Sequence, residues 1–275
     1  MKNALLNRIG LMLVFASVFL ASCSEDEPPY NPESAVATVE DEFVINASFE
    51  DLDNLTIGVM QSSGLGLRTQ GTQTICEGAI VNHDLNGKKI TVNFGSGCTG
   101  PQGVVRKGKL TFSYTGTNFL FPGTSIVTTF EGYEVNGLKI EGTRTLTNTG
   151  INLATSTITL GVKIDNAKIT WPDNTFVTYN STQVRQLKLT NTGYESTITG
   201  TASGKNRANV AYTATITEDL AIKQACVLSG IYIPIAGTLE LTFEGVPITA
   251  DYGDGACDKV ILITYPGGTK EVTVD

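Results

Sequence analysis

The chain has 275 residues, a formal net charge of −8, one histidine and five cysteines. This acidic balance argues against nucleic acid as a partner, because binding to a phosphate backbone needs clustered Lys and Arg. The length allows one large β domain or two small ones that share a sheet. Frequent threonine and 29 glycines favour strands and turns over helices.

Residues 1–22 are predicted to form a lipoprotein signal peptide. Lys2 and Arg8 precede an apolar run from Ile9 to Leu20, which is the order of a secretory signal. This run is too short to cross a hydrocarbon core of about 30 Å. It ends in Leu20-Ala21-Ser22-Cys23, which resembles a bacterial lipobox. In a lipobox the cysteine, here Cys23, receives a diacylglycerol, the chain is cut before it, and the new amino group is acylated, for example with palmitate. An ordinary signal peptide with a coincidental cysteine is the alternative.

Residues 23–33 are predicted to form a tether. Ser24, Glu25, Asp26 and Glu27 are followed by prolines, and charge combined with proline disfavours packing. The four residues resemble the acidic export signal of surface lipoproteins from Bacteroidetes; a plain solvated linker is the alternative. Loss of the signal peptide leaves 17 of the 19 basic residues against 27 acidic ones. We therefore expect an acidic protein that is lipid-anchored in the outer membrane and displayed at the cell surface.

Residues 34–62 are predicted to be helical. Apolar residues recur there at steps of three and four among acidic ones, which is the period of an amphipathic helix. The pattern also allows a break near Asn46 to Ser48. We expect the apolar stripe to pack on the β body or to cap one end of it. Residues 61–73 are rich in Gly, Ser and Thr and are predicted to form a loop.

Residues 63–275 are predicted to form a mainly β body: a large antiparallel meander that curves into a sandwich or an open barrel. Asn86-Gly87 and Asn136-Gly137 favour type I′ hairpin turns. Asp165-Asn166 and Trp171 to Asn174 are predicted to be further turns. Residues alternate between apolar and polar within the segments, so one face is expected to be buried and the other wet.

Two internal echoes suggest related halves, about 74–160 and 161–275. The segment from Ile90 to Cys98 recurs as Ile248 to Cys257, and Leu146 to Gly150 recurs as Leu189 to Gly193. Two echoes are too few for a repeat array, which needs at least about three units.

Several spaced motifs resemble a family of uncharacterised lipoproteins from Bacteroidetes, of the flavobacterial type. The motifs are Cys98-Thr99-Gly100, Arg106-Lys107-Gly108-Lys109, Val135-Asn136-Gly137, Gly142-Thr143-Arg144-Thr145, Ile169-Thr170-Trp171-Pro172-Asp173, and Asp251 to Asp258. The resemblance covers most of the mature chain. It implies a lipoprotein and brings no established activity or catalytic residues.

The cysteines other than Cys23 are expected to form two disulfides, as in other exported proteins. With Asn86-Gly87 at the turn centre, Cys76 lies opposite Gly97, one residue from Cys98. A glycine bulge would close that gap, so we pair Cys76 with Cys98, and by the internal repeat Cys226 with Cys257. A metal site is disfavoured because there is no Cys-x-x-Cys spacing.

No catalytic, cofactor or metal residue is assigned from the sequence. His83, the one histidine, lies in an expected strand with no Gly-x-Ser-x-Gly elbow in the chain. Asp251, Asp254 and Asp258 lack the ligand order of an EF-hand. Five carboxylates are candidates for glycosidase chemistry by position alone: Glu131, Glu134, Glu141, Asp165 and Asp173. Four aromatic residues are candidates for a sugar-stacking platform or for cross-strand pairs: Trp171, Tyr179, Tyr194 and Tyr212.

The function expected from the sequence is non-catalytic: binding or holding a glycan, a protein or another envelope component at the surface. A periplasm-facing carrier of a lipid or other apolar ligand is the first alternative, and it would need a continuous apolar concavity. A carboxylate-dependent glycoside hydrolase is the second, and it would need two carboxylates that face each other in a cleft.

Overall fold

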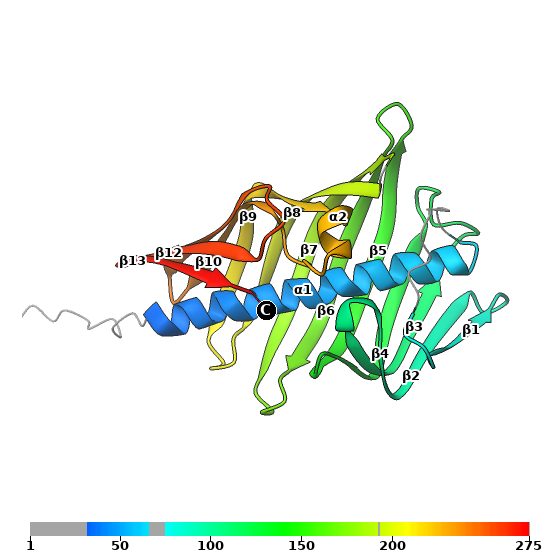
Figure 1. Ribbon diagram of the computed structural model, residues 1–275, viewed down its shortest axis with the longest axis horizontal. Helices are drawn as coiled ribbons and strands as arrows, with labels where there is room; N and C mark the ends of the chain where they lie inside the picture. Colours follow the sequence, from blue (N-terminus) through cyan, green and yellow to red (C-terminus); the bar gives the residue numbers. More distant parts are fainter. Residues whose placement is uncertain (1–31, 66–74, 192, 275) are drawn as a thin grey trace, which may run out of the picture. The chain divides into compact units, whose positions relative to one another are not determined.

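The computed structural model describes residues 32–65, 75–191 and 193–274. The expected signal peptide, Cys23, the export signal from Ser24 to Glu27 and most of the loop over residues 61–73 lie outside the described residues. The described chain is mainly β, as predicted, with one long helix before a single antiparallel sheet of thirteen strands (Figure 1).

The strands lie in the sheet in the order of the chain, each one paired with the next. They are β1 (Ile80–Asp84), β2 (Lys89–Thr99), β3 (Val105–Tyr114), β4 (Ser125–Val135), β5 (Leu138–Asn152), β6 (Thr157–Thr170), β7 (Phe176–Thr190), β8 (Gly193–Lys205), β9 (Ala211–Lys223), β10 (Ala236–Phe243), β11 (Val246–Asp254), β12 (Val260–Tyr265) and β13 (Gly268–Thr273). A 3₁₀ turn, η1 (Pro101–Gly103), precedes β3, and a short helix, α2 (Gln224–Leu228), joins β9 to β10. β1 and β13 are the two edges, so the sheet is open.

The helix α1 (Pro32–Ser62) runs without a break through Asn46 and Ser48, so the possible break there is wrong. The polar side chains at these positions bond within the helix: Asn46 Nδ2 donates to Glu42 Oε1 and Ser48 Oγ donates to Val44 O. Such bonds one turn back satisfy polar groups without interrupting the backbone ladder. The polar residues therefore lie inside a continuous helix.

The sheet curves around α1, which crosses the strands (Figure 1). Arg106 on β3 contacts Asp51, whereas Lys270 on β13 contacts Glu40. In a flat sheet these two strands would lie about 48 Å apart, at about 4.8 Å per strand. The two helical residues are separated by only about 17 Å at about 1.5 Å per residue. The inward face of the sheet must therefore be concave, and α1 lies in that concavity.

Two of the three predicted dipeptide turns are confirmed by the strand register. Ile80 faces Asn93 around Asn86-Gly87, and Val135 faces Leu138 around Asn136-Gly137. Asn136 and Gly137 have the positive φ angles of a type I′ turn, whereas Asn86 and Gly87 do not, so the turn type predicted for the first hairpin is wrong. The prediction of a turn at Asp165-Asn166 is wrong, because β6 continues through it. Asn166 takes a positive φ of 50° there, and the register on both sides shifts, as in a β-bulge. An Asn that tolerates positive φ serves a bulge as well as a turn.

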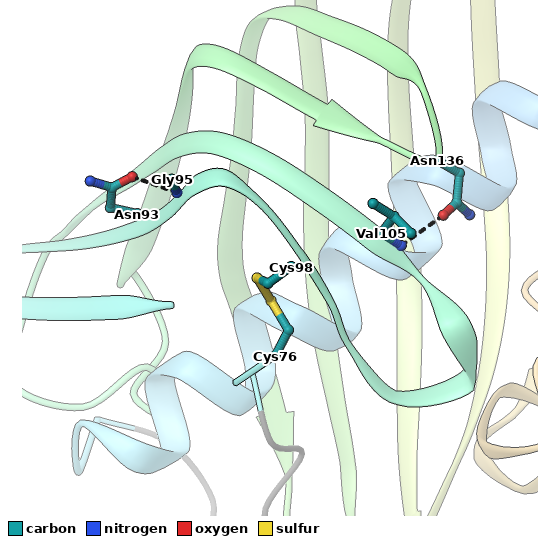
Figure 2. The surroundings of a disulfide bond; sticks show 6 residues. All are labelled: Cys76, Asn93, Gly95, Cys98, Val105 and Asn136. Carbon is teal, nitrogen blue, oxygen red and sulfur yellow. Dashed lines mark hydrogen bonds between the residues drawn. A yellow bond between two sulfur atoms is a disulfide. The ribbon is translucent and has the colours of Figure 1, made fainter. Parts of the chain in front are cut away.

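Both predicted disulfides are confirmed, Cys76–Cys98 and Cys226–Cys257. Figure 2 shows the first beside the bulge at Gly95, whose N–H donates to Asn93 Oδ1. The register of β2 and β3 shifts at this glycine.

The stronger of the two internal echoes has a structural counterpart. In the first copy the disulfide links a cysteine before β1 to one on β2, and in the second it links α2, before β10, to the residues after β11. Gly253 N–H donates to Asp251 Oδ1 in the second copy, as Gly95 does to Asn93 in the first. Each disulfide thus closes the open end of one hairpin.

Candidate functional site: the helix interface and an adjoining cleft

Charged residues fill the middle of the interface between α1 and the sheet. Three arginines from alternate strands meet three carboxylates within little more than one turn of the helix. We call this set the buried ion-pair network: Arg106 on β3, Arg144 on β5, Arg185 on β7, and Glu50, Asp51 and Asp53 on α1. Each arginine has the same alternation parity as buried apolar residues of its own strand, such as Leu110, Leu146 and Tyr179. The arginines therefore point inward, to the helix.

Asp53 lies at the centre of the network. Its carboxylate contacts Arg144 and, at 2.7 Å, Arg185 Nη1, which also lies 2.7 Å from Glu50 Oε2. Arg144 is fully buried, and none of its N–H groups makes a hydrogen bond of normal geometry to the described residues. Its burial keeps water from screening the attraction between Arg144 and Asp53.

Burial shifts the pKa of several groups in the network. It raises the pKa of Glu50 and of Asp51, against the opposing effects of Arg185 and Arg106 respectively. It lowers the pKa of Arg144, against the attraction of Asp53. Burying several charges costs desolvation free energy even when the charges are paired. Removing one partner leaves the other charge buried without compensation for that cost. The network therefore favours one position of α1 along the sheet over any shifted one.

Glu42 lies on α1 nearer its N-terminal end than the buried ion-pair network. It has no basic partner in the described chain. Its carboxylate accepts hydrogen bonds from Tyr179 Oη at 3.1 Å, Tyr212 Oη at 2.8 Å and Asn46 Nδ2 at 3.2 Å. Burial raises its pKa, while these three hydrogen bonds lower it. The hydroxyl of Tyr252, whose pKa is raised by burial and by Glu42, has no hydrogen-bond partner among the described residues.

A cleft of about 350 Å³ opens beside the network, between α1 and the ends of β3 to β6. Its rim includes two hairpin turns, β4–β5 and β6–β7, which approach each other at Gly137 and Pro172. The lining is largely apolar and aromatic with three polar residues: Val44, Ala47, Ser48, Asp51, Val104, Val135, Asn136, Leu138, Trp171, Pro172, Tyr232 and Val274. Ligand sites in proteins are commonly of about 300–1,000 Å³ and have this mixture.

A second, wholly apolar cavity lies between the C-terminal part of α1 and strands β4 to β7. It measures only about 60 Å³ and is lined by residues such as Met60, Phe119 and Leu160. This volume is far below that of the sites that take drug-sized ligands. With α1 in place, the concave face thus offers no room for an acyl chain at this position.

The five candidate carboxylates do not face one another in a cleft. Four of them pair with lysines on the outer side of the sheet: Glu131 with Lys109, Glu134 with Lys107, Glu141 with Lys139, and Asp165 with Lys163. The fifth, Asp173, lies in the β6–β7 turn, and hydrogen bonds from Thr175, then from Arg207, lower its pKa. A general acid of a glycosidase needs a raised pKa, so Asp173 does not suit that role, and the other four carboxylates face lysines rather than one another.

The other expected sites are accounted for by ordinary contacts. His83 on β1 lies 2.8 Å from Tyr114 Oη through its Nε2. Asp251 and Asp258 accept hydrogen bonds from the backbone N–H of Gly253 and Val260. Among the described residues there is no group of three His, Cys, Asp or Glu placed to hold a metal ion. Nor does the part of the chain described here contain a helix long and apolar enough to span a membrane.

The four aromatic candidates do not form one exposed platform. Tyr179 and Tyr212 are buried against Glu42, and Tyr194 donates to Asn54 Oδ1 at 2.9 Å. Trp171 is half-buried and lines the cleft, with Arg207 over its ring at 5.0 Å from the centroid. Of these four residues, Trp171 alone lines the cleft.

Sequence reasoning missed the buried ion-pair network, although the chain carries a signal for it. Arg106, Arg144 and Arg185 each share the alternation parity of core residues, as Arg144 does with Ile140 and Leu146. An arginine at such a position needs an acidic partner. The partners were present among the acidic residues of the predicted helix.

No protein-family model, curated protein or solved structure matches the chain in the comparisons made with each. The resemblance to Bacteroidetes lipoproteins stays a prediction from the motifs quoted above.

Proposed function

We propose that this protein is a non-catalytic lipoprotein, anchored in the outer membrane through Cys23 and displayed at the cell surface. There it binds or holds an envelope component. The lipobox and the acidic Ser24 to Glu27 support the anchoring and the outward orientation. The position of α1 supports the role of a binding module, because the helix fills the concavity that a lipid carrier would need to keep open.

The helix α1 would also connect the lipid anchor to the β body. α1 begins at Pro32, nine residues after Cys23, and nine extended residues span at most about 32 Å. The lipid would thus hold the start of α1 within that distance of the membrane surface. Since α1 is bound to the sheet by the buried ion-pair network, the whole β body would stay close to the membrane.

The carrier alternative would require α1 to leave the sheet. That movement would separate five buried charged groups from one another and from Arg185, and it would expose the core residues of the helix. Breaking a buried ion pair costs about 3–5 kcal/mol for a single pair. The geometry therefore favours a fixed body over a lidded carrier.

The anchoring is tested by metabolic labelling with a palmitate analogue together with membrane fractionation. The wild-type protein should carry label and sediment with outer membranes, whereas a Cys23→Ala variant should carry none and be released. Ser22→Ala is the matched control, because it keeps a small residue before the cysteine and should behave as wild type. A Cys23→Ala variant that is still labelled and still sediments would refute the anchor.

A further inference from the structure

We propose that the cleft beside α1 is a binding site for a neutral sugar ring. This inference rests on the proposed function, since it names the class of envelope component that the displayed body would bind. It is carried by the lining of the cleft, by one buried carboxylate oxygen without a partner, and by the placement of the chain's single tryptophan.

Asp51 supplies the polar group that a ligand would satisfy. Only 5% of this residue is exposed, and its Oδ1 is engaged by Arg106. Its Oδ2 has no hydrogen-bond partner among the described residues. A buried oxygen without a partner costs about 1–3 kcal/mol, more when it is charged. A hydroxyl donor in the cleft could remove that cost.

Two further polar residues line the cleft with complementary chemistry. Ser48 Oγ uses its proton on Val44 O, so its lone pairs are left to accept from a ligand. Asn136 Oδ1 accepts from Val105 N–H at 2.9 Å (Figure 2), so its NH₂ group is the part able to donate. The cleft thus combines acceptors at its helix wall with a donor at its rim.

The rest of the lining suits the apolar face of a ring. Trp171 and Tyr232 present aromatic surface, and Val104, Val135 and Leu138 add aliphatic surface. Arg207 lies over the ring of Trp171 and also bonds Asp173 at 2.7 Å. The indole is therefore held in place before a ligand arrives, which limits the entropy lost on binding.

The charge of the lining excludes the other ligand classes. Among the described residues, no Lys or Arg lines the cleft, and Asp51 does, so an anionic ligand would meet repulsion. Arg106 already neutralises Asp51, so a cation would gain little. A purely apolar ligand would leave the remaining hydrogen-bonding capacity of Asp51, Ser48 and Asn136 unsatisfied. The ligand class that fits the cleft is therefore a neutral ring with hydroxyl donors and an apolar face.

The experiment uses the fluorescence of Trp171, which reports on the cleft alone because it is the only tryptophan. The full mature protein in detergent is titrated with methyl glucoside, methyl galactoside and methyl mannoside, and with glucuronic acid as the anionic counterpart. At least one neutral glycoside should shift the emission in a saturable manner, and glucuronic acid should bind at least tenfold more weakly. A shift with glucuronic acid but with none of the neutral glycosides, or no saturable shift at all, would overturn the proposal.

Matched variants place the binding in the cleft. Ala47→Leu on α1 fills the cleft without removing a hydrogen bond and should weaken binding at least tenfold. Ala37→Leu, the same change at an exposed helical position outside the lining, should leave it unchanged. Asn136→Asp keeps the acceptor for Val105 but loses the NH₂ donor, and should also weaken binding. Equal affinity in wild type and Ala47→Leu would refute the site.

The two proposals fail separately. A protein that is displayed at the surface but binds none of the glycosides refutes the sugar site and leaves the proposed function standing. A protein that binds a glycoside in vitro but is enclosed in the periplasm refutes the display and leaves the sugar site standing.

Discussion

Arg144 on β5 and Asp53 on α1 form an ion pair in which the arginine is wholly buried and the aspartate nearly so. The pair joins a residue from the middle of the sheet to one from the helix that precedes the sheet in the chain. Because Asp53 also pairs with Arg185 on β7, one carboxylate joins three elements. The docking of α1 depends on it.

Replacement of Asp53 by Asn should therefore lower the free energy of unfolding by about 3–5 kcal/mol, since Arg144 would be left buried without its ion-pair partner. Urea unfolding followed by circular dichroism measures the change. Asp165→Asn is the control: Asp165 pairs with Lys163 on the outer face, and such a pair contributes at most about 1 kcal/mol. Similar losses in the two variants would contradict the role given to the network.

Glu42→Gln should flatten the dependence of stability on pH. Burial raises the pKa of Glu42 in the folded state, so the folded chain holds this proton more tightly than the unfolded one. Stability from this group is present below the unfolded pKa of about 4.3 and is lost as the pH rises through the folded pKa. Gln removes that loss and keeps polar atoms for Tyr179 and Tyr212 to bond.

The measurement for Glu42 is urea unfolding at several pH values from acidic to neutral. Asp41 adds to the same trend, because burial raises its pKa to about 6, against the effect of Arg207. The comparison is therefore between the slopes of wild type and variant. A Glu42→Gln variant that loses as much stability with rising pH as the wild type would refute this account.

Gly108→Ala should destabilise the protein by about 2–5 kcal/mol. Gly108 has φ of 79° at the β3 bulge, and a Cβ there would lie 2.1 Å from the backbone oxygen of Gly132. Both the left-handed backbone, at about 1–2 kcal/mol, and the overlap, at about 1–3 kcal/mol, contribute. Gly132→Ala separates the two, since its φ is 56° but a Cβ would meet nothing within 4 Å. If Gly108→Ala and Gly132→Ala lowered the melting temperature equally, the overlap between the Cβ at position 108 and Gly132 would contribute nothing, which would contradict this prediction.

The local features of the sheet could be predicted because they depend on short-range chemistry. The Asn86-Gly87 turn fixed the register that faces Ile80 with Asn93, and this register placed Cys76 beside Cys98. The same local reasoning failed at Asp165-Asn166, because a residue with positive φ is required in a bulge as well as in a turn. Sequence alone does not distinguish the two when the strands on both sides are long.

The placement of α1 could not be predicted, because it depends on pairs far apart in the chain. Asp51 and Arg106 are 55 residues apart, and Glu50 and Arg185 are 135 apart. The spacing of apolar residues in α1 predicts that one apolar stripe is buried. In the structure the acidic residues of the helix that meet the sheet are buried as well. The cleft was missed for the same reason, since Trp171, Asp51 and Tyr232 come from three separate segments.

The central claim is that the protein is displayed at the cell surface, and protease shaving of intact cells tests it most directly. Wild type is compared with a variant in which Glu25, Asp26 and Glu27 are replaced by Ala, with a periplasmic protein as the control for intact cells. The account predicts that wild type is lost and that the variant survives. Survival of both proteins would contradict surface display and make the periplasmic carrier the leading hypothesis.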